Sequence, residues 1–388
     1  MYVTRPLSLY RDSSSGSGSD SGLPSGPNTG VLVIEDEGSE RRWFFGLLKA
    51  KSVKVPPFPQ NKLMKLWYSK GIHSDTDDFE AMLIPVLNQP SNSNQYYVIS
   101  SDVIEKGLAC TSSKECDVKN SCCFTYIFDI SPQIFDPRNV YQQFHITNRY
   151  TFFGRPGGFV SKSTAIDGIP PDFLRHYGWQ ARTRTLKNFN PTPALGVDDA
   201  LRTRLPELDL GNPVEVGKWY CPFIFIRDGE VGVQMRKSPY YEMTLQQNWE
   251  EIFGCYNDSG GGGVMVDVCV RREAVLVGGA LLAAERVVVS DGIMWFGPWP
   301  SEVGLSMAIV ERVKWEEERV GFVWGRNHEE EIERVLRREE FEGEGVWKRV
   351  RCYVLVERFV LKRMDATLVL TWEFRHTHQI RTKWENEN

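Results

Sequence analysis

The sequence has no apolar run long enough to cross a membrane as a helix. Its longest such run is Ala274–Ala284, AVLVGGALLAA, whereas a spanning helix needs about 20 apolar residues. The first residues, MYVTRPLSLYRDSS, also lack the apolar segment of a secretory signal peptide. We therefore expect a soluble protein with no membrane span, located in the cytoplasm or the nucleus.

The sequence also has no excess of positive charge. Its formal net charge is -5 at pH 7, whereas a nucleic-acid surface needs clustered Lys and Arg to neutralise phosphates. Aromatic residues make up 12% of the chain and could stack on bases, but Trp219, Trp249 and Trp315 fall on or beside patterned core faces. We expect no nucleic-acid partner.

Common catalytic and phosphate-binding motifs are missing. There is no G-x-S-x-G segment, which argues against an α/β-hydrolase. Gly260–Gly263 is not followed by the Lys-Ser/Thr of a P-loop, and Gly278-Gly279 lacks the rest of a G-x-G-x-x-G motif. We interpret both glycine runs as loops, and we assign no catalytic residue, no cofactor-binding residue and no cofactor.

The cysteine spacing of a zinc site is absent as well. Four of the eight cysteines are close in sequence, Cys110, Cys116, Cys122 and Cys123, but none forms the C-x2-C pair of a zinc ribbon. Cys122 and Cys123 would point to opposite faces of a strand, so we expect reduced, structural cysteines without disulfides. Cys221 could pair with a histidine as a nucleophile, but it lies within an apolar strand, and we interpret it as packing.

Histidine and glutamate groups offer two further candidate sites. His376 and His378 flank Thr377, so a strand would place both on one face, where a third ligand could complete a metal site. Because the segment is rich in Arg and Gln, we interpret it as an exposed polar strand instead. Glu316–Glu318 and Glu329–Glu331 are interleaved with basic residues, which favours a solvated helix face over a catalytic carboxylate pair. We assign no metal ligand.

Length and composition favour more than one globular domain. The chain has 388 residues, of which 41% are hydrophobic and 25% charged, enough for a large core. Residues 1–30 form a short leader followed by a Ser/Gly-rich tract at 13–30 with too little apolar surface to stay ordered. The leader is either a targeting or docking segment or a strand that returns to the fold. We expect a β-rich amino-terminal half at 31–200 and an α+β carboxyl-terminal half at 211–388.

Short strands dominate the predicted amino-terminal half. Residues 31–34, 63–68, 82–87 and 95–100 have β patterns, and no helical pattern separates them, which predicts an antiparallel meander. Pro170-Pro171 predicts the start of a short helix that ends at Gly178.

Val216–Phe253 is the most informative stretch. Residues 219–226 are apolar on both faces, which predicts a buried strand. Asp228-Gly229 predicts a hairpin turn, with a return strand at 231–235. A helix is then predicted from Thr244, with an apolar stripe at 245, 249, 252 and 253. We interpret the whole stretch as core structure without a catalytic group.

The rest of the second half predicts strands and two helices. Alternating valines at 264–270 predict a half-buried strand, and residues 349–374 predict two closing strands around 363–365. Apolar stripes at 305, 309 and 313 and at 332, 335 and 336 predict the helices. The predicted fold class is therefore α+β, a β-rich protein of antiparallel meander sheets with a few covering helices and two interacting halves.

Five segments resemble a plant-specific family, the "domain of unknown function 1262" proteins. The segments are MYVTRPLSLY, 84–99 (IPVLNQPSNSNQYYVI), 169–179 (IPPDFLRHYGW), 216–253 and 304–321 (GLSMAIVERVKWEEERVG). The resemblance implies a soluble plant protein of a single family, and it transfers no catalytic residue. The Ser/Gly tract at 13–30 and Gly260–Gly263 depart from the family pattern as local insertions.

Two hypotheses about function follow from these patterns. The sequence favours a non-catalytic interaction protein, linked to stress or defence, that binds a protein partner through mixed-charge helices at 305–342. The alternative is an enzyme or small-molecule binder whose site lies between the two halves, since such a site leaves no local motif.

Overall fold

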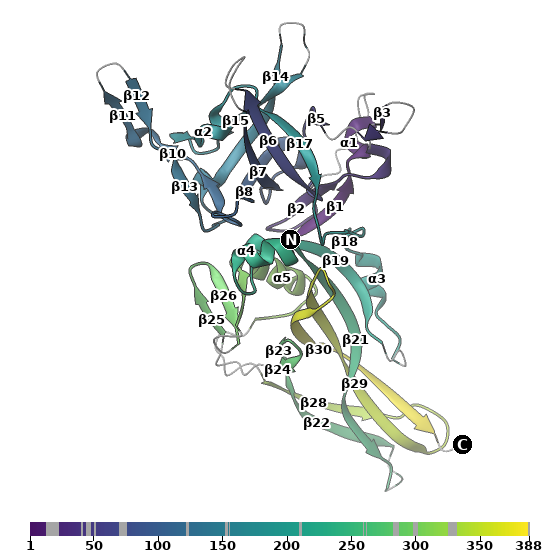
Figure 1. Ribbon diagram of the computed structural model, residues 1–388. Coiled ribbons are helices and arrows are strands. Elements are labelled where there is room, and N and C mark those ends of the chain that lie inside the picture. The colour runs from purple at the N-terminus through teal and green to yellow at the C-terminus, as the bar shows by residue number, and fades with distance from the viewer. Residues whose placement is uncertain are drawn as a thin grey trace. The chain divides into compact units, whose positions relative to one another are not determined.

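Strands account for most of the secondary structure in this computed structural model (Figure 1). The structure describes residues 1–12, 23–39, 42–43, 48–49, 52–69, 76–121, 124–151, 154, 156–208, 212–258, 260, 262–281, 287–297, 302–324 and 332–386. The expectation of a β-rich protein with antiparallel sheets is confirmed.

The chain divides into two units, each built from several segments. Unit 1 comprises Met1–Ala194, Trp219–Tyr241 and Leu305–Arg312. Unit 2 comprises Leu195–Lys218, Glu242–Gly304 and Val313–Asn388. The division into a leader at 1–30 and halves at 31–200 and 211–388 stays a prediction. The α+β class with two halves also stays a prediction.

An antiparallel sheet organises unit 1. Its strand order is β13-β9-β8-β7-β6-β17-β5, and β14 pairs with β8 and β15. The strands are β5 (Ser52–Val53), β6 (Lys62–Ser69), β7 (Thr76–Pro85), β8 (Gln95–Ser100), β9 (Ala109–Thr111), β13 (Ile130–Gln133), β14 (Gln143–Tyr150), β15 (Pro156–Ser163) and β17 (Gln180–Thr185). The meander predicted through 63–68, 82–87 and 95–100 is therefore confirmed in β6, β7 and β8.

Aromatic side chains fill the core of unit 1. The rings of Phe58 and Phe159 lie 4.9 Å apart between centroids, and Trp179 is 4.9 Å from Phe159. Tyr96 closes the group with an edge contact to Phe58. These four side chains are fully buried, and aliphatic side chains such as Leu66 and Val98 pack in the same cluster.

The remaining elements of unit 1 are short. Strand β1 (Tyr2–Pro6) runs parallel to β2 (Gly30–Ile34) and pairs with β19 at Tyr220. The other strands are β3 (Arg42–Trp43), β4 (Leu48–Lys49), β10 (Ser113–Lys114), β11 (Val118–Ser121), β12 (Phe124–Ile127), β16 (Gly168–Ile169) and β20 (Ile226–Arg227). The α-helices are α1 (Ser8–Asp12), α2 (Asp172–Arg175) and α4 (Val231–Lys237), and short 3-10 turns cover Glu37–Ser39, Ser91–Ser93, Glu115–Asp117, Val140–Gln142 and Phe223–Phe225.

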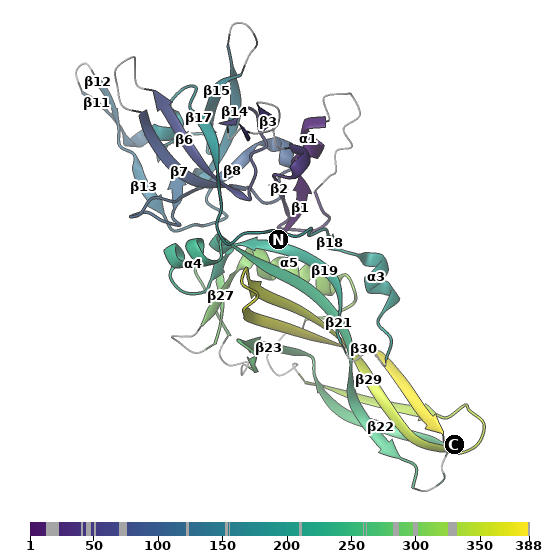
Figure 2. The ribbon, with the colours of Figure 1, turned by 45° about the vertical axis from the view of Figure 1, so that its right-hand side comes forward.

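Three long strands form the framework of unit 2. In the order β19-β21-β29-β30-β23-β24, the strands β21 (Tyr240–Tyr256), β29 (Trp347–Arg363) and β30 (Leu368–Asn386) lie side by side (Figure 2). The flanking strands are β19 (Val214–Pro222), β23 (Glu273–Val277), β24 (Ala280–Leu281) and, beside β19, β18 (Gly196–Val197). The predicted pair of closing strands around 363–365 is confirmed as the β29–β30 hairpin.

Smaller elements complete unit 2. Strand β22 (Gly263–Arg271) pairs with β28 (Ile332–Glu340), and β25 (Val287–Ser290) pairs with β26 (Ile293–Phe296). Strand β27 (Val303–Ser306) leads into helix α5 (Met307–Glu318), and α3 (Asp199–Arg204) precedes the sheet. The helix predicted from the stripe at 305, 309 and 313 is confirmed for 309 and 313 as α5, whereas Leu305 lies in β27; the last residues of α5 belong to unit 2.

Two predictions within Val216–Phe253 are wrong. Residues 231–235, predicted as a return strand, lie in helix α4, which buries Gln234 and Met235. The helix predicted from Thr244 is part of β21, a strand of 17 residues. A helix cap contributes about 1 kcal/mol. Strand β21 lies between β19 and β29, so its backbone pairs on both sides, and this pairing outweighs the local cap signal.

The second predicted helix of 305–342 is also wrong. Residues 332–340 form β28, and all nine pair with β22 in continuous antiparallel register. The apolar residues at 332, 335 and 336 had suggested a helical stripe, but Val335 alone of the three is buried. Residues 325–331, which include the predicted helix start and Glu329–Glu331, lie outside the described residues.

The longest apolar run, 274–284, contributes to β23 and β24 where it is described. In the parts of the chain that the structure describes, no helix has both the length and the apolar character to span a bilayer.

Gly158 in β15 should be far more sensitive to a side chain than Gly229. Both have positive φ, but a Cβ at Gly158 would lie 2.3 Å from the carbonyl oxygen of Gly178, whereas a Cβ at Gly229 would meet nothing within 4 Å. Gly158→Ala should lower the free energy of unfolding by about 2 to 4 kcal/mol, and Gly229→Ala by about 1 kcal/mol. Urea denaturation measures both, and equal effects would contradict the close approach.

Candidate functional site

Charged side chains are buried together inside unit 2. Among the described residues, five such side chains that are at most 3% exposed meet at one place. They are Arg202 of α3, Glu316 and Glu317 of α5, Glu357 of β29 and His376 of β30, and we name them the buried charge cluster. Burying an ion costs several kcal/mol, so each charge here needs a partner.

Arg202 is the centre of the cluster. Asp198 caps α3 by accepting a hydrogen bond from Leu201 N at 2.9 Å, which fixes the turn that carries Arg202. The Arg202 guanidinium donates to both oxygens of Glu357, with Nε 2.9 Å from Oε1. Its Nη1 is 3.2 Å from Glu316 Oε2, and its Nη2 is 3.4 Å from Glu317 Oε1. One planar cation therefore contacts three carboxylates.

Two further side chains support this arrangement. Gln247 of β21 donates from Nε2 to Glu357 Oε1 at 2.7 Å and to the carbonyl oxygen of Arg202 at 3.2 Å. Arg319, just after α5, lies 2.6 Å from Glu316 Oε2 through Nε and also contacts Asp199. The positive charge of Arg319 therefore offsets Glu316, which leaves Arg202 to offset Glu357.

Glu317 and His376 form the remaining pair. His376 Nε2 is 3.1 Å from Glu317 Oε2 and 3.7 Å from Glu357 Oε2. Neither His376 Nε2 nor Glu317 Oε2 makes a hydrogen bond, so the two atoms lie at ion-pair distance without hydrogen-bond geometry. Gln247 Oε1 is likewise buried without a partner.

The cluster shifts the pKa of its members in opposite directions. Burial raises the pKa of Glu317, and the neighbouring Glu357 raises it further. The pKa of Glu357 lies well below its usual range because Arg202 and His376 outweigh the effect of burial. Burial alone would lower the pKa of His376, but Glu317 and Glu357 raise it to about 9. Glu317 and His376 therefore both hold their protons to higher pH than they would in water.

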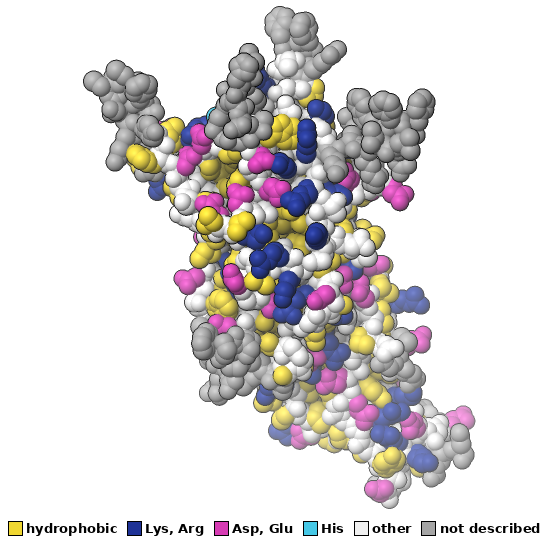
Figure 3. All heavy atoms as spheres, in the orientation of Figure 1, with side chains coloured by type: hydrophobic (Ala, Val, Ile, Leu, Met, Phe, Trp, Pro, Cys, Tyr) yellow, Lys and Arg dark blue, Asp and Glu magenta, His cyan; other side chains and the backbone are white. Residues whose placement is uncertain are grey.

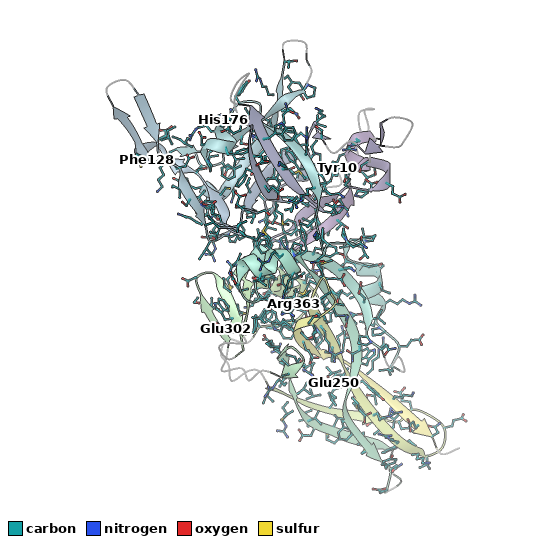
Figure 4. All side chains as sticks on the ribbon, viewed as in Figure 1. Tyr10, Phe128, His176, Glu250, Glu302 and Arg363 are labelled. Atoms are coloured by element: carbon teal, nitrogen blue, oxygen red, sulfur yellow. The ribbon has the colours of Figure 1, made fainter. Side chains whose placement is uncertain are left out.

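The two faces of the long sheet carry different chemistry. Glu357 and Arg358 are neighbours in β29 and so point to opposite faces. On the face opposite the cluster, Arg358 and Arg375 contact Glu373, and Arg375 also contacts Glu250. Glu250 lies midway along this sheet (Figure 4). These side chains are 12% to 36% exposed, so they form a cross-strand ladder of partly exposed ion pairs.

The structure corrects two interpretations of candidate residues. Glu316 and Glu317 were expected on a solvated helix face, but both are fully buried, because Arg319 and Arg202 contact Glu316 and His376 and Arg202 contact Glu317. His376 was expected on an exposed strand, but it is buried beneath α5, while His378 is exposed with Nε2 3.2 Å from the carbonyl oxygen of Val320. The two rings do lie on one face, 5.4 Å apart between centroids.

Two of the cysteines pack in the core of unit 1. Cys221 is fully buried, and burial raises the pKa of its thiol to about 12, as expected of a packing residue. Cys110 is buried with its pKa raised to about 12, and Cys116 is exposed. Cys122 and Cys123 lie outside the described residues.

Sequence reasoning missed Arg202, Gln247 and Glu357. Glu357 left a signal, because it interrupts the apolar run of β29 on the face that otherwise packs in the core. Arg202 left none, since α3 is a short polar helix in the sequence. Only the tertiary structure brings these three residues to Glu317 and His376.

A second feature of unit 2 is exposed. In the β22–β28 pair, Met265 faces Arg338, Asp267 faces Leu336, and Arg271 faces Ile332. Directly opposed residues share one side of a sheet, so these side chains form a single surface, which we name the ribbon face. Over this end of unit 2, hydrophobic, basic and acidic side chains lie beside one another (Figure 3).

Removing Arg202 should be much more costly than removing an exposed arginine. Arg202→Met leaves buried carboxylates without their cation, which should lower the free energy of unfolding by about 3 to 5 kcal/mol. Arg334→Met is the matched control, because Arg334 holds Asp267 with two bonds at the surface. Its unfolding midpoint should barely move. Similar midpoints for both variants in chemical denaturation would refute the central role of Arg202.

The raised pKa of His376 should appear in the pH dependence of stability. The folded protein keeps a proton that the unfolded chain releases near pH 6.5, so this stabilisation is complete below pH 6.5 and is lost as pH rises through about 9. Its size is on the order of 3 kcal/mol.

Urea denaturation in metal-free buffer should therefore show that the stability advantage of wild type over His376→Gln shrinks between pH 6.5 and pH 9.5. His378→Gln, two residues along the strand, should keep the wild-type slope in that range. A constant advantage across the range would mean that His376 titrates normally.

Comparison with known proteins gives a family match over part of the chain. The model of a family described as "Protein of unknown function (DUF1262)" matches residues 25–124, which supports the resemblance to that family for this segment. No curated protein matches the chain. Among solved structures, the chain is similar to one described as "Crystal structure of Cry35Ab1", with 12% identity over 84% of this chain and 90% of that chain and a TM-score of 0.46.

Proposed function

We propose that the protein is a non-catalytic interaction protein that binds a protein partner through the ribbon face of unit 2. The observation that carries this proposal is the exposure of three large apolar side chains on that face. Met265, Leu336 and Ile332 are 56%, 59% and 55% exposed. Apolar side chains gathered at a surface gain free energy when a partner covers them.

The two sides of the β22–β28 pair support this reading. On the other side, Val266, Val270 and Val335 are buried. The ribbon therefore already has a side that packs against the protein, and the apolar residues of the ribbon face are additional to it. The sequence predicted a partner surface on two helices at 305–342. This segment contains one helix, α5, and one strand, β28, and the exposed residues of the proposed surface lie on β28.

The charges of the ribbon face indicate the chemistry of the partner. Arg271, Arg334 and Arg338 lie on it with Asp267 and Glu340, which leaves one net positive charge. Arg334 is held by Asp267, and Arg338 lies 3.1 Å from Glu340. A polypeptide surface with apolar side chains and acidic neighbours complements this pattern.

The alternative of an enzyme or small-molecule binder has less support. Groups with strongly shifted pKa values are the usual sign of a catalytic site. In the described part of the chain, buried tyrosines and cysteines have pKa values raised by burial in the core, whereas strong shifts of glutamate and histidine occur in the buried charge cluster, whose members are at most 3% exposed. A substrate would have no access to them, so the cluster supports a structural role.

The remaining parts of the proposal rest on the sequence. A plant source and a link to stress or defence follow from the family resemblance, which the match at residues 25–124 supports only at the level of the family. A cytoplasmic or nuclear location follows from the sequence patterns alone.

Partner capture should depend on the ribbon face and on no neighbouring surface. A photo-crosslinking residue at position 336 should yield adducts in plant extract, whereas the same residue at position 337 should not. Arg337 faces Val266 on the other side of the ribbon, which makes it a matched control.

The double variant Met265→Ser/Leu336→Ser should reduce capture by at least about tenfold, since central apolar contacts contribute most of the affinity at interfaces. Its far-UV spectrum should equal that of wild type because both positions are exposed. Adducts of equal yield from positions 336 and 337, or unchanged capture by the double variant, would refute this surface.

A further inference from the structure

The geometry points to a binding site for one divalent transition-metal ion, of which Zn²⁺ fits best, between Glu317, Glu357 and His376. One ligand atom from each of these residues lies within 4.8 Å of the other two. The site is structural rather than catalytic, because all three side chains are buried. It would join α5 to strands β29 and β30 inside unit 2.

The distances between the donor atoms match the edges of a coordination shell. Zinc bonds to imidazole nitrogen and carboxylate oxygen are about 2.0 to 2.2 Å long, so two ligands of one ion lie roughly 3 to 3.5 Å apart. His376 Nε2 is 3.1 Å from Glu317 Oε2 and 3.7 Å from Glu357 Oε2. These two edges therefore differ from a coordination shell by a few tenths of an ångström. The third edge, between the two carboxylates, is at most 4.8 Å, and it would shorten when an ion binds.

The hydrogen bonding of these atoms supplies an independent observation. His376 Nε2 and Glu317 Oε2 are buried without a hydrogen bond, although they lie close together. A buried polar atom that makes no hydrogen bond is costly, and a metal ion would coordinate both atoms at once. Gln247 Oε1 is also buried without a partner, on a side chain whose Nε2 is 2.7 Å from Glu357 Oε1.

The arginine of the cluster is compatible with an ion at this place. Arg202 contacts Glu317 through Oε1, which leaves Oε2 available. It contacts both oxygens of Glu357, and each carboxylate oxygen has a second lone pair for the ion. Arg202 would thus not bind the ion itself. It would orient the two carboxylate ligands through hydrogen bonds, as residues that contact metal ligands commonly do.

The donor set selects the class of ion. One imidazole nitrogen and two carboxylate oxygens suit Zn²⁺, Mn²⁺ or Fe²⁺, whereas Mg²⁺ and Ca²⁺ prefer oxygen ligands alone. Four-coordinate zinc needs one more ligand, for which a water molecule suffices.

The test uses the full chain, freed of metal with a chelator and then titrated with Zn²⁺, Co²⁺ or Mg²⁺. Zn²⁺ should bind at one equivalent per chain and raise the melting temperature, because a ligand of the native state alone stabilises it. Mg²⁺ should have no effect. Co²⁺ should give a visible spectrum of nitrogen and oxygen coordination without the near-ultraviolet band of a thiolate ligand.

Two variants and two controls locate the ion. Glu317→Gln and His376→Gln should weaken Zn²⁺ binding by at least about tenfold. His378→Gln should bind like wild type, since His378 contacts the carbonyl oxygen of Val320 instead. Cys269→Ser, which removes an exposed thiol, should also bind like wild type.

The site would be refuted if the wild-type protein bound no Zn²⁺. It would also be refuted if the Co²⁺ spectrum showed a thiolate band, or if Cys269→Ser were the only variant that weakened Zn²⁺ binding. If a glutamine variant does not fold, the stoichiometry and Co²⁺ spectrum of the wild type still decide the question.

Discussion

The ion pairing of Arg202 is the constraint on which the interior of unit 2 depends. Three carboxylates are buried around this guanidinium, and each would destabilise the fold if its countercharge were removed. Apolar packing holds surfaces together without fixing their register, whereas a planar cation with directed donors also fixes orientation. The contact therefore sets how α3 and the end of α5 lie on β29.

The long strands of unit 2 separate two kinds of electrostatics within a few ångströms. Glu357 and Arg358 are adjacent in sequence, yet the first belongs to the buried charge cluster and the second to the cross-strand ladder with Glu373. Water screens the ladder and lowers the energy of its pairs, while the cluster has no such screening. The large pKa shifts of Glu317 and His376 are a direct result of this difference.

Part of this structure could be predicted from the sequence, and the successes share a cause. Strands β6, β7 and β8, helix α5 and the β29–β30 hairpin all have a clear local period of apolar residues and occur as predicted. The predictions at β21 and β28 are wrong. There a capping signal or an apolar stripe indicated a helix, but the residues pair with distant strands. Local preferences are worth about 1 kcal/mol or less per residue, so pairing along a whole strand overrides them.

The sequence by itself determined that the protein is rich in antiparallel strands, that Cys221 is a packing residue, and that a helix occupies the end of the 304–321 segment. The tertiary structure alone decided which charged residues are buried. A glutamate or histidine appears the same in a sequence whether it faces water or a guanidinium, because its burial depends on countercharges from distant segments. For Glu317 the distant segment is α3, 115 positions away along the chain in the contact Arg202–Glu317. For His376 it is α5, which supplies Glu317 at 3.1 Å.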